Sequence, residues 1–199
     1  MPRKKPAGLP PGGAAPPTPG SVYRLKVSLD YIRPMIWRRV EVPDCTLEVL
    51  HEVIQRCMPW NSSHLWCFEV GRTRYLDPEF LDFPEDRPAN GVRLGGLAAA
   101  GVKKLKYTYD FGDTWDHQVT VEKTVPREPG VKYPRCTAGA RNCPPDDCGG
   151  FPGYERMLYI LGHPGHEEHE DMLEWVGGSF DPEAFDLDAI NKDLAKLKV

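Results

Sequence analysis

The chain has 199 residues, of which 40% are hydrophobic, and a formal net charge of −4. This length suits a single domain with a core of its own, and no apolar run approaches the roughly 20 residues that a membrane-spanning helix needs. Residues 140–199 carry 13 acidic and 5 basic side chains, which argues against broad contact between this part and a phosphate backbone.

The first twenty residues are rich in proline and glycine and show no apolar periodicity. They offer too little hydrophobic surface to offset the entropy of ordering, and they lack the apolar centre of a signal peptide. We therefore expect a disordered leader over residues 1–20, one domain over residues 21–199, and a cytoplasmic location without membrane contact.

The apolar pattern after the leader predicts both strands and helices. Strands are expected over residues 22–29, 36–42, 65–70, 72–76, 105–111 and 118–124. Helices are expected over residues 47–58, with Thr46 as N-cap, over 154–161 and 167–176, and from Asp181 onward. Residues 77–101 and 126–153 show little regular structure, and a loop as long as the second is usually functional or internally tied.

This order of strands, helix, strands and helices predicts an α+β fold. We expect a mixed or mostly antiparallel sheet, a long helix in the N-terminal half and a C-terminal helical segment.

The segment 107–117 is the densest group of functional side chains, with four aromatic residues, three aspartates and one histidine. Such a group at a strand end is typical of binding and catalytic loops, and we expect it to pack against residues 134–154. The candidate ligand-binding residues are Tyr109, Asp110, Asp113, Trp115, His117, Asp146, Asp147, Gly149 and Gly150. The candidates for catalysis are Asp113, His117 and Asp147. A structural interpretation stays open, in which Asp110 and Asp113 accept backbone amides in a turn.

Three of the six cysteines, Cys136, Cys143 and Cys148, lie within the second long loop. Without a secretion signal, free thiols or metal ligation are favoured over disulfides. The three thiolates could hold zinc or another divalent cation, with His117 or a nearby aspartate as the fourth ligand. However, the spacing lacks the two-residue gap of a zinc knuckle, and buried thiols that pack a long loop explain the same residues.

A nucleic-acid surface would have to use the basic residues of the first two strands and the loop between them. These candidates are Arg24, Lys26, Arg33, Arg38 and Arg39. The alternative interpretation is a solvated strand face, which the negative net charge of the chain favours.

Five blocks of the sequence together resemble the plasmid pRiA4b ORF-3-like family. The blocks lie within residues 32–39, 46–54, 60–68, 107–117 and 133–154, and residues 166–172 and 180–182 extend the match. The resemblance implies an α+β domain of unknown function. Some family members resemble passenger proteins of insertion elements and carry a resolvase-like label.

Two functions stay open at this point. The first is a cytoplasmic interaction or regulatory domain, associated with mobile elements, with a protein or nucleic-acid partner. The second is a metal-assisted enzyme that uses the acidic and histidine-containing loop around Asp113 and His117.

Overall fold

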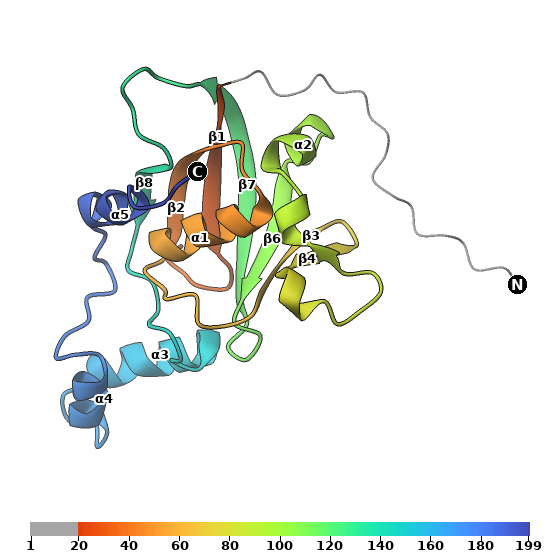
Figure 1. Ribbon diagram of the computed structural model, residues 1–199. Coiled ribbons are helices and arrows are strands. Elements are labelled where there is room, and N and C mark those ends of the chain that lie inside the picture. Colours follow the sequence, from red (N-terminus) through yellow and green to blue (C-terminus); the bar gives the residue numbers. More distant parts are fainter. Residues whose placement is uncertain (1–19) are drawn as a thin grey trace, which may run out of the picture.

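A computed structural model describes residues 20–199, which form one eight-stranded sheet with helices packed around it (Figure 1). The strands are β1 (Ser21–Leu29), β2 (Trp37–Pro43), β3 (Trp66–Val70), β4 (Thr73–Leu76), β5 (Arg87–Pro88), β6 (Lys104–Tyr109), β7 (Trp115–Pro126) and β8 (Arg135–Ala140). Their order across the sheet is β5-β4-β3-β6-β7-β1-β2-β8, and all neighbours are antiparallel except β4 and β5. The fold is therefore α+β with a mixed, largely antiparallel sheet.

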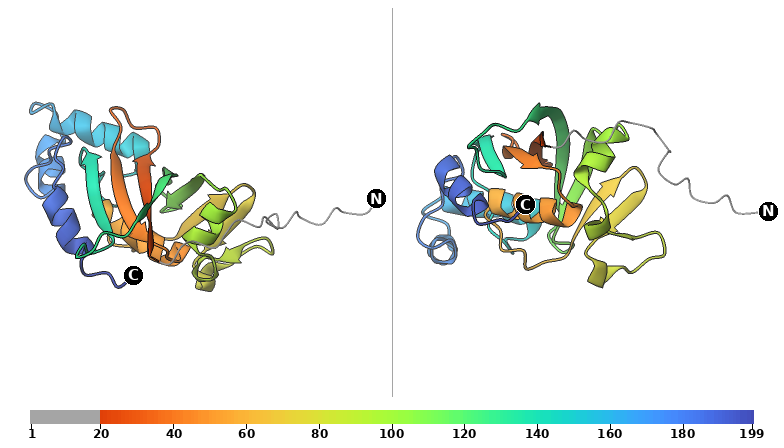
Figure 2. Two further views of the ribbon diagram at one scale, coloured as in Figure 1. Left: turned by 90° about the horizontal axis from the view of Figure 1, so that it is seen from above. Right: turned by 45° about the horizontal axis from the view of Figure 1, so that its top comes forward.

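The helices are α1 (Leu47–Cys57), α2 (Leu94–Ala99), α3 (Gly150–Leu161), α4 (His169–Trp175) and α5 (Leu187–Leu194), with short 3₁₀ turns η1 (Pro78–Phe80) and η2 (Ala89–Gly91). Helix α1 lies across one face of the sheet (Figure 1). Helices α3, α4 and α5 gather on the β8 side, while β3, β4 and α2 lie on the opposite side (Figure 2). No helix of this part of the chain has the length and apolar composition that crossing a bilayer requires.

The core contains the buried face of β1 and the buried face of α1. Leu25, Val27 and Leu29 alternate along β1 and are buried, while Leu50 and Ile54 lie one helical turn apart on α1 and are also buried. The hydroxyl of Thr46 accepts a hydrogen bond from the amide of Val49 (3.2 Å), so the predicted N-cap of α1 is confirmed.

The segment 126–153 contains a strand that the apolar pattern did not predict. Strand β8 pairs with β2 from Trp37 opposite Ala140 to Glu41 opposite Arg135. It is an edge strand of small residues, and it is formed by backbone pairing rather than by an alternating apolar face. At Gly139 a Cβ atom would lie 2.5 Å from the ring of Phe185, so this position has no room for a larger side chain.

The last helix begins later than expected, at Leu187 rather than near Asp181. The carboxylate of Asp181 accepts the amide of Glu183 (2.9 Å) and forms only a turn, whereas Asp186 accepts the amide of Ala189 (2.9 Å) and caps α5. Two cap-like sequences occur close together, and only the second is followed by an apolar face that packs on β8 and α1. The predicted leader lies almost wholly outside the described residues, and the one-domain prediction stays a prediction.

Candidate functional site

The turn between β6 and β7 organises the densest group of polar side chains. Strand β6 ends at Tyr109, and Asp110 adopts a left-handed backbone conformation (φ 56°). Its Oδ1 atom accepts hydrogen bonds from the amides of Gly112 (2.8 Å) and Asp113 (3.3 Å). Asp110 thus forms the turn that the structural interpretation expected, and its second carboxylate oxygen does not take part in these bonds.

The loop before α3 packs directly on this turn, at the lower end of the sheet in Figure 1. Asp113 accepts a hydrogen bond from the amide of Gly149 (3.0 Å). A Cβ atom at Gly150 would lie 2.4 Å from the carbonyl oxygen of Asp113, so only glycine allows this approach. Gly149 and Gly150 therefore bring two segments of the chain together, and their role in ligand binding stays a prediction.

This contact places Asp147 beside Asp110 and brings both next to His64. The Nε2 atom of His64 lies 3.0 Å from Oδ1 of Asp147 and 3.8 Å from Oδ2 of Asp110. One ligand atom from each of the three side chains lies within 4.8 Å of the other two. The residues come from the loop before β3, the β6–β7 turn and the loop before α3.

Sequence reasoning singled out both aspartates but not His64. The usable signal was its position, because His64 lies just before β3 and the first residue of that strand, Trp66, pairs with Tyr109. Any residue two places before Trp66 is therefore close to the end of β6. That pairing is visible only once the order of strands in the sheet is known.

Two polar atoms around this cluster, Tyr109 Oη and Asp146 Oδ1, have no hydrogen bond of good geometry among the described residues, whereas His64 Nε2 is paired with Asp147. Tyr109 is 0% exposed, and the edge of its ring faces the His64 imidazole at 5.7 Å between centroids. Burial raises the pKa of Tyr109, the nearby charge of Asp146 adds to this increase, and contacts with Ser63 and the backbone of His64 oppose it. Burial also raises the pKa of Asp146, although the amide of Asn61 (3.2 Å) and the His64 side chain oppose it. Polar atoms that are buried without partners are uncommon and mark a place where a bound group could supply the missing interactions.

A pocket of about 210 Å³ adjoins the cluster and shares His64 with it. Its walls come from the loop before β3, the end of β4, the η1 turn and the β6–β7 turn. The lining residues are Ser62, Ser63, His64, Leu65, Trp66, Leu76, Asp77, Phe80, Asp82 and Phe111.

His117 does not join this site. Strand alternation places Trp115, His117 and Val119 on the core face of β7, and all three are buried. The imidazole packs edge-on against Trp60 (5.4 Å between centroids), and its Nδ1 atom lies 3.3 Å from the carbonyl of Tyr107. Burial lowers the pKa of His117 to about 4. We therefore correct the expectation that this histidine shares a site with Asp113 and Asp147.

The candidate zinc ligands are also not brought together. Within residues 20–199, the one group of at least three potential ligands contains no cysteine. Cys136 contacts the carbonyl of Ala138 (3.4 Å), while the Cys143 thiol lies 3.1 Å from the Met58 sulfur. Burial raises the pKa of Cys143 to about 11 and that of Cys148 to about 12, whereas a hydrogen bond with Cys57 lowers the pKa of Cys136. Cys136 and Cys143 are buried and Cys148 is partly buried, so within the described residues the three thiols pack the loop without converging on one point.

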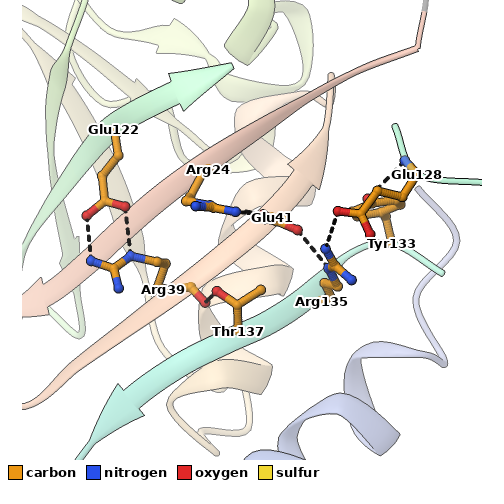
Figure 3. Close-up of polar contacts among 8 residues, drawn as sticks. All are labelled: Arg24, Arg39, Glu41, Glu122, Glu128, Tyr133, Arg135 and Thr137. Carbon is orange, nitrogen blue, oxygen red and sulfur yellow. Dashed lines mark hydrogen bonds and ion pairs between the residues drawn. The ribbon is translucent and has the colours of Figure 1, made fainter. Parts of the chain in front are cut away.

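The basic candidates for nucleic-acid contact differ in their environments. Arg38 is buried and bonds to protein carbonyls, so it cannot reach a phosphate. Arg39 forms a paired bond to Glu122 (2.7 and 2.9 Å), and Arg24 bonds to Glu41 (2.9 Å), as Figure 3 shows.

Glu41 itself is fully buried between Arg24 and Arg135. Burial alone would raise its pKa, but the two guanidinium groups hold the pKa of Glu41 below its usual range. The guanidinium charges on this sheet face are therefore largely matched by carboxylates. Lys26 lies over the Trp37 ring (5.1 Å), and Arg33 bonds to the carbonyl of Ile32 (2.8 Å).

A family profile described as "Plasmid pRiA4b ORF-3-like protein" matches residues 21–189, which include every residue of the cluster. The chain belongs to the plasmid pRiA4b ORF-3-like family. Its relative "Uncharacterized protein y4hQ" of Sinorhizobium fredii is 40% identical over 181 residues, which cover 89% of this chain and 92% of that protein.

A solved structure of the same shape supports the assignment to the pRiA4b ORF-3-like family. It is the crystal structure of the protein of unknown function MM3350 from Methanosarcina mazei Go1, with a TM-score of 0.78 and 41% sequence identity. The match covers 87% of this chain and 97% of that protein. These relatives establish the family and the fold of the chain.

Proposed function

We propose that this domain binds a divalent cation at His64, Asp110 and Asp147 and that the cation acts on a ligand in the adjoining pocket. The observation that carries the proposal is the convergence of one imidazole nitrogen and two carboxylate oxygens from three separate segments. Two ligand atoms that each lie about 2.1 Å from one ion at a right angle are about 3 Å apart. The distance of 3.0 Å between His64 Nε2 and Asp147 Oδ1 fits this arrangement.

The choice of donors favours a transition metal over calcium. One imidazole with two carboxylates suits Mn²⁺ or Zn²⁺, because borderline cations accept nitrogen and hard oxygen ligands together. Three protein ligands leave coordination positions open, as in catalytic rather than structural metal sites. The Oη atom of the buried Tyr109 lies beside the cluster without a hydrogen bond of good geometry, so a water or ligand held at the ion could bond to it.

The position of His64 links the cation to the pocket, because the same side chain is part of both. A cation in such a place polarises an oxygen of a bound molecule or lowers the pKa of a bound water molecule. The proposed function is thus a metal-assisted enzyme centred on His64 and Asp147 instead of Asp113 and His117.

The test is a calorimetric titration of the metal-free full-length protein with Mn²⁺ and, separately, with Zn²⁺. We expect one ion per chain and at least about a tenfold weaker affinity in His64→Ala and in Asp147→Asn, because each removes one of three ligands. His163→Ala is the matched histidine control, since His163 is exposed after α3. Asp113→Asn is the matched aspartate control, since asparagine keeps an acceptor for Gly149.

Unchanged affinity in both site variants would contradict the proposal. A loss that occurs in Asp113→Asn but not in His64→Ala would move the site to the β6–β7 turn itself.

An interaction domain is the second candidate, because two large aromatic side chains are exposed on the C-terminal helices. Tyr159 on α3 and Trp175 on α4 are both at least half exposed. If they form a contact between copies, sedimentation should show concentration-dependent association that Trp175→Ser abolishes. A regulatory role and a link to mobile elements stay predictions from the family resemblance.

A further inference from the structure

We propose that the pocket beside His64 receives a small organic cation, namely an amine attached to an apolar or aromatic body. This inference names the ligand class for the pocket beside the proposed cation site. It rests on the proposed function in one respect, because the far end of the ligand would contact the cation. The walls of the pocket combine apolar side chains with two carboxylates.

The apolar part of the pocket has a buried floor and an exposed rim. Trp66 and Leu76 form the floor and are buried, whereas Leu65, Phe80 and Phe111 around them are 40%, 44% and 41% exposed. Large apolar side chains that stay exposed around a concave surface mark a place where a ligand gains by covering them. The three aromatic rings suit a planar or aliphatic body.

The charged part of the pocket is acidic. Asp77 and Asp82 supply carboxylates, and the ten lining residues include no lysine and no arginine. One oxygen of Asp77 accepts the amide of Glu79 (2.9 Å), which fixes the position of this carboxylate at the start of η1. An ammonium group would be attracted both to these carboxylates and to the faces of neighbouring aromatic rings.

The same walls disfavour an anionic ligand. A phosphate or carboxylate would meet two aspartates without any guanidinium or ammonium group to pair with it. In the metal-free protein, the acidic residues Asp110 and Asp147 beyond His64 add to this field. An anion could bind only through direct coordination to a cation at His64, and this route gives the experiment its second arm.

The size of the pocket limits the ligand further. Its volume of about 210 Å³ is below the roughly 300–1,000 Å³ of sites for drug-sized molecules. A single ring with a short aminoalkyl chain fits this space, whereas a nucleotide or a large cofactor does not.

The experiment compares three probes that differ only in their head group: phenethylamine, 2-phenylethanol and 3-phenylpropionate. Each is titrated into the full-length protein with ¹H–¹⁵N NMR detection, once after metal removal and once with Zn²⁺. We expect phenethylamine to shift the amides of Leu65, Phe80 and Phe111 in a saturable manner. Its affinity should exceed that of 3-phenylpropionate by at least about tenfold in both conditions.

A double variant, Asp77→Asn with Asp82→Asn, tests the source of the preference. Asparagine at position 77 keeps an oxygen for the amide of Glu79, so η1 should stay folded. Phenethylamine should bind about tenfold more weakly to this variant, while the Zn²⁺ affinity stays unchanged. Asp188→Asn is the control, because Asp188 is exposed in the first turn of α5.

The outcomes separate the two proposals. Equal binding of the three probes to the wild-type protein, or binding of 3-phenylpropionate alone in the presence of Zn²⁺, would overturn the amine class and leave the cation site standing. Selective binding of phenethylamine to a protein that takes up no Zn²⁺ would support the amine class and remove the cation site.

Discussion

Two polar clusters lie within the same fold, one around Arg38 and one around His64, and they differ in whether their atoms have partners. Arg38 is 2% exposed and donates five hydrogen bonds, to the carbonyls of Cys57, Trp37, Ala140 and Arg141 and to the Cys143 sulfur. The His64 side chain is 28% exposed and pairs with the exposed Asp147, and the nearby Tyr109 hydroxyl has no hydrogen bond of good geometry in the described chain.

The difference separates a structural role from a binding role. The Arg38 side chain satisfies carbonyls of α1, β2 and the end of β8 together, so it holds these elements in place. Around His64 the Tyr109 hydroxyl is buried without a hydrogen bond of good geometry, which weakens the folded state unless something else binds there, whereas Asp147 is 70% exposed. Both clusters contain charged residues, and they differ in how completely their buried polar atoms are hydrogen-bonded.

The largest effect should come from Arg38. Arg38→Met leaves several buried carbonyls without donors, and we expect a loss of about 4 kcal/mol in the free energy of unfolding. Denaturation in urea measures it. Arg39→Met is the matched control, because the neighbouring Arg39 is paired with Glu122 on the solvent side and should cost less than about 1 kcal/mol. Equal losses in the two variants would remove the distinction between the buried and the exposed arginine.

The next effect is a loss of stability in acid that comes from the buried imidazole of His117 rather than from the site. The pKa of His117 in the folded chain is about 4, below the ordinary value of 6.5. Between these values the unfolded chain binds a proton that the folded chain does not, so stability falls as the pH decreases from about 6.5 to 4. Full stability is present above about pH 6.5, and the loss from His117 should reach about 3 kcal/mol.

Denaturation midpoints measured across this pH range check the prediction. His117→Gln should flatten the dependence, whereas His64→Ala should leave most of it in place. His51, whose pKa burial lowers to about 3, contributes in the same direction and should preserve part of the slope in His117→Gln.

A smaller effect is expected where the loop before α3 meets the β6–β7 turn. Gly150→Ala adds a Cβ atom 2.4 Å from the Asp113 carbonyl, and Gly150 also has a positive φ of 66°. We expect a loss of about 2 kcal/mol and weaker cation binding, because Asp147 moves with the loop. Gly96→Ala is the control, since a Cβ atom there meets nothing within 4 Å and alanine favours the helix. A destabilised Gly150→Ala protein with unchanged cation affinity would separate the loop from the site.

The smallest effect should distinguish two tyrosines of β6. The Tyr107 hydroxyl lies 2.7 Å from His51 Nδ1 and 3.0 Å from the Gln55 amide, whereas the Tyr109 hydroxyl has no hydrogen-bond partner among the described residues. Tyr107→Phe should therefore cost about 1–2 kcal/mol, and Tyr109→Phe less than about 0.5 kcal/mol in the metal-free protein. Thermal unfolding of both variants provides the measurement. A large cost for Tyr109→Phe would mean that its hydroxyl already has a partner in the unliganded state.

Much of the fold could be predicted from local pattern. The alternation in β1 and the cap and apolar stripe of α1 lie within a few residues of one another, so neighbouring side chains reveal them. Strand β8 could not be predicted in this way, because its small residues show no period and its partner β2 lies far away in the sequence.

The candidate site was predictable in part. Asp110 and Asp147 belong to motifs dense in turn residues, and their meeting follows from a long loop that has to pack on something. His64 and the inward direction of His117 were not predictable, since the first depends on the pairing of β3 with β6 and the second on which face of β7 is covered.

The sequence by itself determined the α+β class, the cap of α1 and the dense polar turn after β6, because each depends on spacing along the chain. Only the tertiary structure decided that Arg38 points inward while Arg39 faces solvent, and that His64 rather than His117 joins the aspartates. The physical reason is that the role of a polar side chain depends on the groups that it contacts in the folded chain. Those partners come from segments far apart in sequence, and no local period records them.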